Sequence, residues 1–149
     1  MEYDINLTEL INPGMVKEAD FLIEEEHTAK HVGSGASRVL ATPWMIAFME
    51  RVAHRMLAEY LPEGYSSVGV SINVRHLAPT PVGVKVRVRC QVKAVENMRV
   101  TFAIEARDFE DKVGSGEHER FVIDTKRFLD RVERKVSKLT LEQSPGEEG

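Results

Sequence analysis

The sequence predicts an α+β domain in which one apolar helix packs against one curved antiparallel sheet. The helix begins at Thr42-Pro43, and residues 43–49 carry no charge. Four segments of alternating apolar and polar residues follow, a pattern typical of half-buried strands. The connections between them are short, which favours an antiparallel meander or a close relative of one.

The composition predicts one soluble domain over residues 1–140. The chain has 149 residues, 42% of them hydrophobic, which is enough for a real core. Its 20 basic and 24 acidic residues nearly balance, so charge does not favour nucleic acid or an anionic membrane as a partner.

The lone Cys90 excludes an intramolecular disulfide, and the first residues lack the pattern of a secretory signal. No segment has the roughly 20 apolar residues of a membrane-spanning helix. We therefore expect a cytoplasmic protein.

The elements around the helix follow from local patterns. Residues 16–26 fit a first strand loosely, and the glycines and serine in residues 27–37 predict a mobile loop. Thr42 is expected to cap the helix, with Pro43 in its first turn. Pro62 and Gly64 mark its end, and a helix this apolar must be surrounded by other structure.

The predicted strands cover residues 66–77, 84–92, 99–107 and 112–123. In the first of them, Val68, Val70, Ile72 and Val74 are expected to share the inward face. Residues 125–141 carry apolar side chains at helical spacing and predict a C-terminal helix. The acidic end, residues 141–149, is expected to be disordered.

Glu50 departs from its surroundings because it follows seven uncharged residues in the most apolar part of the chain. A carboxylate there loses solvation, which favours a base or nucleophile near neutral pH. The alternative is that Glu50 opens the solvated half of the helix and pairs with Arg51 or His54.

His76 continues the parity of Val68, Val70, Ile72 and Val74 and should point to the apolar side of its strand. An inward imidazole near a buried glutamate is a candidate for general acid–base work. A core histidine bonded to the backbone, or a strand that turns outward before Pro79, is the alternative.

Thr42 has a structural explanation as the helix cap, and the same position places its hydroxyl at the positive end of the helix dipole. Oxyanions and carbonyl oxygens are stabilised there. Other candidates are weaker: Glu50 and His54 lack the second histidine of a metal site, so no metal is expected. Cys90 falls on an apolar strand face and is expected in the core.

Three strings of the sequence resemble the fluoroacetyl-coenzyme A thioesterase family of hot-dog proteins. They are ATPWMIAFMERVA at 41–53, SVGVSINVRHLAPTPVG at 67–83 and VGSGEHERFVI at 113–123. The similarity extends from about residue 16 to residue 135. It implies a hot-dog fold, in which the sheet wraps around the central helix.

The resemblance implies a site and an activity. Thr42, Glu50 and His76 fall on the family's catalytic positions, and Gly69 and Arg120 match substrate-binding positions. The implied reaction is hydrolysis of an acyl-CoA thioester in a homodimer with interfacial sites, and CoA is part of the substrate, with no separate cofactor. Whether dimers pair further, and whether Glu50 attacks the carbonyl or activates water, stay open.

One departure concerns the substrate. The fluoroacetyl-specific members close their pocket with an aromatic lid, whereas no Phe, Tyr or Trp occurs between Phe21 and Trp44. A general short- or medium-chain or aryl acyl-CoA is therefore expected. The alternative functions are an acyl-CoA-binding sensor without catalysis and a hot-dog hydratase, since one fold hosts several chemistries.

Overall fold

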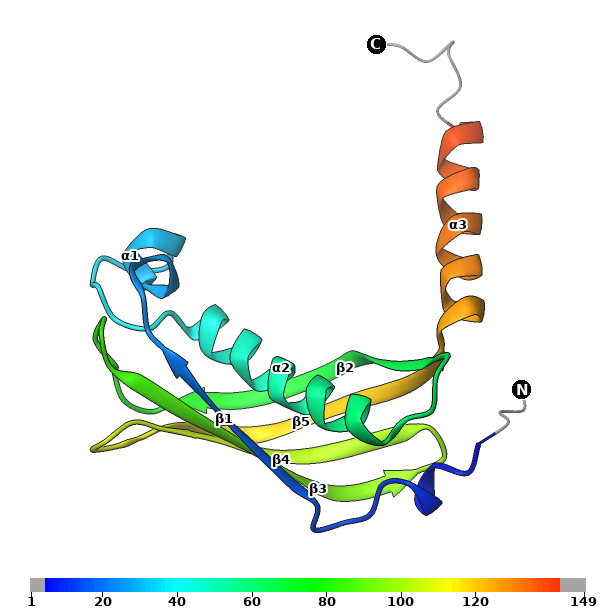
Figure 1. Ribbon diagram of the computed structural model, residues 1–149. Coiled ribbons are helices and arrows are strands. Elements are labelled where there is room, and N and C mark those ends of the chain that lie inside the picture. The colour runs from blue at the N-terminus through cyan, green and yellow to red at the C-terminus, as the bar shows by residue number, and fades with distance from the viewer. Residues whose placement is uncertain (1–4, 143–149) are drawn as a thin grey trace.

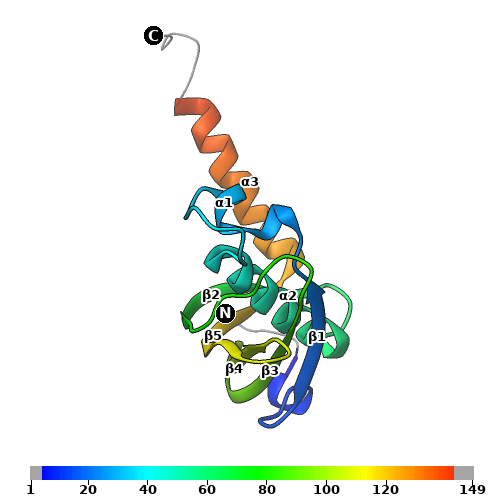
Figure 2. The ribbon, with the colours of Figure 1, turned by 90° about the vertical axis from the view of Figure 1, so that its left-hand side faces the viewer.

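The computed structural model describes residues 5–142, and its centre is a helix held in a curved sheet of five antiparallel strands (Figures 1 and 2). The strand order is β1-β3-β4-β5-β2. The strands are β1 (Val16–Leu22), β2 (Tyr65–His76), β3 (Lys85–Glu96), β4 (Arg99–Arg107) and β5 (Lys112–Asp124). The α-helices are α1 (Ala29–Val32), α2 (Thr42–Tyr60) and α3 (Thr125–Glu142), with short 3-10 turns at Leu7–Glu9 and Glu25–His27.

Helix α2 supplies one half of the core, as its apolar sequence predicts. One face is almost completely buried, with exposures of 0–2% for Met45, Phe48, Met49, Val52, Ala53, Met56 and Leu57. The concave side of the sheet supplies the other half through alternate residues of β3 and β4, whose burial patterns alternate between buried and exposed. The predicted α+β class with a central wrapped helix is therefore confirmed.

The meander prediction holds for three strands. β3, β4 and β5 are neighbours both in sequence and in the sheet, whereas β2 pairs with β5 and not with β3. β2 therefore forms one edge of the sheet and β1 the other. The predicted strand ranges agree with the observed ones to within a few residues, and β3 extends further than expected, to Glu96.

The predicted loop over residues 27–37 was wrong for its first half. Helix α1 forms at Ala29–Val32, and the Thr28 hydroxyl accepts a hydrogen bond from the His31 N–H at 3.1 Å. Gly33 ends the helix in the left-handed conformation, with φ of 88°. The Thr28 cap and the glycine together were the available signal for this short helix.

The prediction that Val68 and Val70 share a face with Ile72 and Val74 was also wrong. A β-bulge shifts the β2–β5 register between Gly69 and Ser71. The extra residue reverses the alternation, so that Val68 and Val70 line a cleft with Phe128 of α3, while Ile72 and Val74 pack against the core. Beyond the bulge, the inward parity that places His76 is the predicted one.

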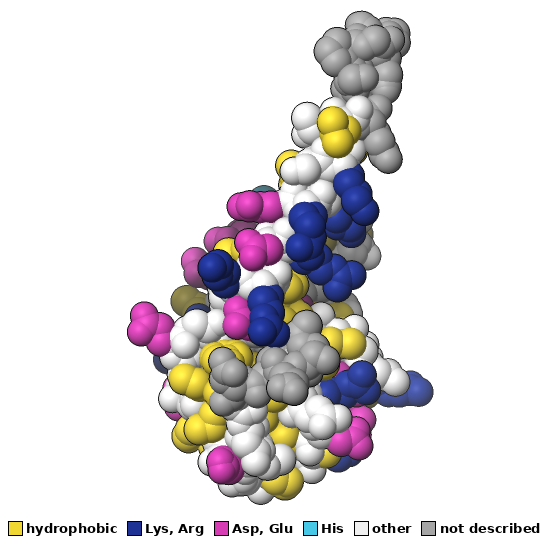
Figure 3. Space-filling model, turned by 90° about the vertical axis from the view of Figure 1, so that its right-hand side faces the viewer, with side chains coloured by type: hydrophobic (Ala, Val, Ile, Leu, Met, Phe, Trp, Pro, Cys, Tyr) yellow, Lys and Arg dark blue, Asp and Glu magenta, His cyan; other side chains and the backbone are white. Residues whose placement is uncertain are grey.

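Helix α3 confirms the predicted C-terminal helix and projects away from the sheet (Figure 1). It keeps an exposed apolar stripe that includes Leu129, Val132, Val136 and Leu139. Figure 3 shows Lys and Arg side chains gathered along helix α3. The expected disordered end lies outside the described residues, apart from residues 141 and 142, which belong to α3.

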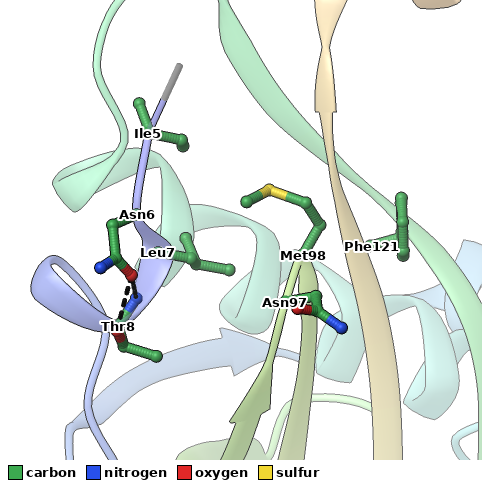
Figure 4. Close-up of a pocket in the computed structure, with 7 residues that line it drawn as sticks. All are labelled: Ile5, Asn6, Leu7, Thr8, Asn97, Met98 and Phe121. Atoms are coloured by element: carbon green, nitrogen blue, oxygen red, sulfur yellow. Dashed lines mark hydrogen bonds between the residues drawn. The ribbon is translucent and has the colours of Figure 1, made fainter. Parts of the chain in front are cut away.

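A hollow of about 530 Å³ lies between the N-terminal segment and the β3–β4 turn (Figure 4). Its lining is uncharged: Ile5, Asn6, Leu7, Thr8, Asn97, Met98 and Phe121. The Asn6 side chain is already bonded within its own segment, because its side-chain oxygen accepts a hydrogen bond from the Thr8 hydroxyl at 2.6 Å. This hollow therefore lacks the acid–base groups of a reaction site. Over the described chain, no helix is long and apolar enough to cross a membrane.

We predict that Gly116→Ala strongly destabilises the fold. A Cβ at residue 116 would lie 2.1 Å from the Asn73 carbonyl oxygen and 2.6 Å from Val74 Cα, so the backbones of β2 and β5 would have to separate. We expect a loss of about 2 kcal/mol or more in the free energy of unfolding, measured by denaturant titration. Ser115→Ala is the control and should stay near the wild type; equal stability of the two variants would contradict the prediction.

Candidate active site

The N-terminus of α2 brings together two of the predicted catalytic residues. Thr42 Oγ1 lies 2.7 Å from His76 Nδ1, which joins the start of α2 to the end of β2. The expected capping role of Thr42 was wrong, because Ala41 occupies the cap position and Thr42 is the first helical residue. Since no backbone N–H occupies its hydroxyl as a cap, the hydroxyl is free to bind the imidazole.

His76 has one nitrogen still available. Its Nε2 atom is buried and makes no hydrogen bond in the described part of the chain. Burial lowers the pKa of His76, while the backbone of Ala78 acts in the opposite direction. The neutral imidazole is therefore favoured near pH 7, which is the form that takes up a proton.

A cavity of about 380 Å³ opens beside this pair. Ser34, Thr42 and His76 contribute its polar side chains, and the rest of the wall is apolar, from the α1 segment and the β2–β3 connection. Leu40, Ala41, Leu77, Ala78 and Pro79 are among the lining residues. A small apolar group fits such a lining next to the Thr42–His76 pair.

Glu50 lies over Gly69, at the bulge of β2. A Cβ at residue 69 would lie 2.8 Å from Glu50 Oε2, so any side chain there would displace the carboxylate from its present position. The same Cβ would lie 3.4 Å from His118 Cε1 and 3.6 Å from Arg120 Nη1. Glu50, predicted from its place in the helix, therefore meets Gly69 and Arg120, both predicted from the family resemblance, at one place.

Arg120 is 6% exposed and is held by Ser67. Its Nε donates to Ser67 Oγ at 2.8 Å and its Nη2 to the Ser67 carbonyl at 3.1 Å. Burial lowers the pKa of Arg120, and the charge of Glu50 opposes that change. The guanidinium thus places a positive charge beside the Glu50 carboxylate.

Within one protomer these residues form two groups. Thr42 and Glu50 are eight residues apart on α2, which is roughly 12 Å along the helix axis. The structure therefore pairs Thr42 with His76 at one end and Glu50 with Gly69 and Arg120 further along. It does not bring all five together in one chain.

Two residues of the Glu50 group were not predicted from the sequence. His118 and Ser67 are 1% and 6% exposed and both bind Arg120. Ser67 stands outside any nucleophile-elbow motif, so its sequence neighbours do not mark it as a site residue. The signal for His118 was its position two residues before Arg120, since residues i and i+2 of a strand share a face.

The remaining polar and reactive side chains have structural roles. Strand β3 carries a row of basic side chains on its outer face, and Arg87, Arg89 and Lys93 of this row form ion pairs with Asp20, Glu18 and Glu117. Cys90 is 0% exposed, and burial raises the pKa of its thiol to about 11, so it is a core residue as predicted. Among the described residues, no three His, Cys, Asp or Glu side chains are grouped as a metal site would require.

Comparison with known proteins identifies the family. The model of the fluoroacetyl-CoA-specific thioesterase family matches residues 23–126. A fluoroacetyl-CoA thioesterase from Streptantibioticus cattleyicolor is 35% identical over 123 residues, which cover 78% of this chain and 88% of that protein. The chain belongs to the fluoroacetyl-CoA-specific thioesterase family.

Solved structures agree with this family assignment. A structure of a fluoroacetyl-CoA thioesterase has 34% identity and a TM-score of 0.78, covering 84% of this chain and 97% of that one. A hot-dog-like protein from Thermanaerovibrio acidaminovorans has 28% identity and a TM-score of 0.82, covering 88% and 97% of the two chains. The expected hot-dog fold and the expected thioester hydrolase class are thereby confirmed.

We predict that the protein loses stability as the pH falls from about 7 to 5. Burial lowers the pKa of both His76 and His118, so the folded state keeps these rings neutral. The unfolded chain binds protons at the ordinary histidine pKa of about 6.5, and stability is lost as the pH falls below it. Thermal melting at pH 7.5 and 5.5 should show a lower Tm at pH 5.5.

The control for this prediction is His31→Ala, which removes an exposed histidine and should leave the pH dependence unchanged. A Tm that stays constant or rises between pH 7.5 and pH 5.5 would contradict the assignment of neutral buried rings.

Proposed function

We propose that the protein hydrolyses an acyl-CoA thioester to a free acid and CoA, and that Thr42, Glu50 and His76 carry the reaction. The observation that carries the proposal is the position of Glu50, whose carboxylate oxygen lies against the open backbone of Gly69. Family membership supports the reaction class, and a mutant of a related fluoroacetyl-CoA thioesterase has been solved with fluoroacetate and CoA.

Each residue has a chemical role in this proposal. The Glu50 carboxylate attacks the thioester carbonyl or takes a proton from an attacking water. The bond between the carbonyl carbon and sulfur then breaks, and neutral His76 carries protons between water, the Thr42 hydroxyl and the leaving thiolate. In the first route a water molecule then hydrolyses the anhydride formed on Glu50, which releases the acid and regenerates the carboxylate. Donors at the start of α2 and the Gly69 N–H stabilise the oxyanion.

We propose further that the active site is shared between the two subunits of a homodimer. Within one chain, Thr42 and His76 lie about two helical turns from Glu50. An antiparallel partner whose two-fold axis passes near Ile46 of α2 would set each Thr42 beside Glu50 of the partner subunit. The same axis, crossing β2 between Gly69 and His76, would set each His76 beside Gly69 of the partner subunit.

Two surfaces support association with a second copy. β2 is an edge strand of 12 residues, and a long open edge is a template for pairing with another strand. Beside it, Val70 is 51% exposed and joins Val68 and Phe128 in a cleft that continues into the apolar stripe of α3. A second copy that pairs along β2 would cover this apolar surface, and the stripe on α3 is a site for further pairing of dimers.

The proposed substrate is a short- or medium-chain or aryl acyl-CoA. No Phe, Tyr or Trp stands between Phe21 and Trp44, and both of these are partly buried against Phe48. An aromatic lid is therefore missing from the segment that precedes α2. We also propose a cytoplasmic location, in keeping with a single buried cysteine.

We predict that Glu50→Gln lowers the turnover of acyl-CoA by about a hundredfold or more, because the amide can neither attack nor take a proton. The measurement is steady-state thiol release from a panel running from acetyl-CoA to palmitoyl-CoA, with phenylacetyl-CoA included. Glu59→Gln is the matched control, since Glu59 is exposed on the same helix and pairs with Lys17. If the wild-type protein releases no thiol from any member of the panel but still binds acyl-CoA, the result would instead favour an acyl-CoA sensor.

We predict that mixing two inactive variants restores activity. In a heterodimer of Glu50→Gln and His76→Ala, one shared site has both residues intact and the other has neither. After subunit exchange, about a quarter of the wild-type rate is expected, since half of the dimers are mixed and half of their sites are whole. A mixture as inactive as its parents would place each site within one subunit.

A further inference from the structure

His118 is almost fully enclosed, with 1% of its surface exposed. It lies on the inward face of β5, where its ring stacks near Phe102 at a centroid separation of 6.4 Å. Burying a histidine costs free energy unless its polar atoms are bonded. Both ring nitrogens of His118 are bonded, and each has a different kind of partner.

The two partners determine the protonation of the ring. Nδ1 lies 2.8 Å from the carbonyl oxygen of Ser71, which only accepts, so Nδ1 carries the proton. Nε2 lies 3.2 Å from Arg120 Nη1, which only donates, so Nε2 is the acceptor. A second proton on the ring would face the guanidinium, and His118 is therefore neutral with the proton on Nδ1.

His118 completes the support of Arg120. Ser67 binds Nε and Nη2 of the guanidinium, and His118 binds Nη1. None of these partners is an anion, and no ion pair of Arg120 shorter than 4.0 Å occurs among the described residues. The charge of Arg120 is thus compensated across a short gap by Glu50.

The Ser71 bond connects the same ring to the β2 bulge. The register shift lies between Gly69 and Ser71, and the His118 Nδ1–H binds the carbonyl at its far side. The bulge is what turns Gly69 toward Glu50, since it reverses the alternation of β2. One imidazole therefore holds both the cation beside Glu50 and the backbone beneath it.

We propose that His118 is a positioning residue for the thioesterase reaction: as a neutral imidazole it aligns the Arg120 guanidinium and the Gly69–Ser71 bulge around the Glu50 carboxylate. This inference rests on the proposed role of Glu50. His118 itself does not touch the substrate. Its loss displaces Arg120 and leaves the Glu50 carboxylate without a fixed cation beside it.

The kinetic test compares His118→Phe with His118→Gln. Phenylalanine keeps the ring and removes both nitrogens, whereas the glutamine side chain keeps an acceptor for Arg120. We expect His118→Phe to lower kcat by about tenfold to a hundredfold with KM little changed, as misalignment of a reacting group does. His118→Gln should recover part of the lost kcat, and His31→Phe, on the exposed α1, should leave kcat unchanged.

A second test does not depend on activity. In wild-type protein with ¹⁵N-labelled histidine, NMR should show His118 still neutral and protonated on Nδ1 at the ordinary histidine pKa of about 6.5, where a free imidazole is half charged. A charged ring, or a proton on Nε2, would overturn the proposal even if His118→Phe does not fold.

The two proposals fail in different ways. A His118→Phe enzyme with wild-type kcat overturns the positioning role. A lower kcat with no recovery by His118→Gln also overturns it, since a general loss of packing explains that result. Normal turnover by Glu50→Gln contradicts the proposed function instead, and the NMR result still decides the state of His118.

Discussion

The structure depends on the burial of one face of α2. Met45, Met49 and Val52 on this face are 0% exposed, and only a sheet that curves around the helix removes so much apolar surface from water. The curved sheet is not regular throughout. It contains a bulge in β2, and glycines in β5 allow the neighbouring backbone and side chains to approach closely. The polar residues of the site stand where this packing is interrupted, at the start of α2 and at the bulge.

Much of the fold was predictable because its signals are local. The uncharged run of α2 and the alternation in β3 and β4 each appear within about ten residues, and their predicted types were confirmed. The pairing of β2 with β5 was not predictable in the same way, since it joins segments that are separated by two other strands. The bulge was hidden because Gly69 and Val70 continue the alternating pattern in the sequence.

The candidate site shows the same division. The parity of β2 placed His76 on the inward side, and the hydroxyl bond to Thr42 at 2.7 Å agrees with the expected neighbourhood. The predicted capping role of Thr42 was wrong because helix α2 begins one residue earlier than expected. Ala41 is the cap residue and Thr42 is already helical, so the Thr42 side chain is not used as a cap. Ser67 and His118 were not predicted because each matters only through its bond to Arg120. Ser67 lies on the neighbouring strand β2, and His118 lies two residues before Arg120 on β5, so neither is marked by a motif of its own.

The position of Cys90 has a chemical consequence. The chain has one thiol, and it is buried between the sheet and α2, where its pKa is raised to about 11 and its sulfur lies 3.8 Å from Met56 Sδ. An enzyme that liberates a free thiol at every turnover works in the presence of oxidised forms of that thiol. Because thiolate is the species that attacks disulfides, Cys90 resists forming a mixed disulfide with such a product, and the core is protected from the chemistry at the site.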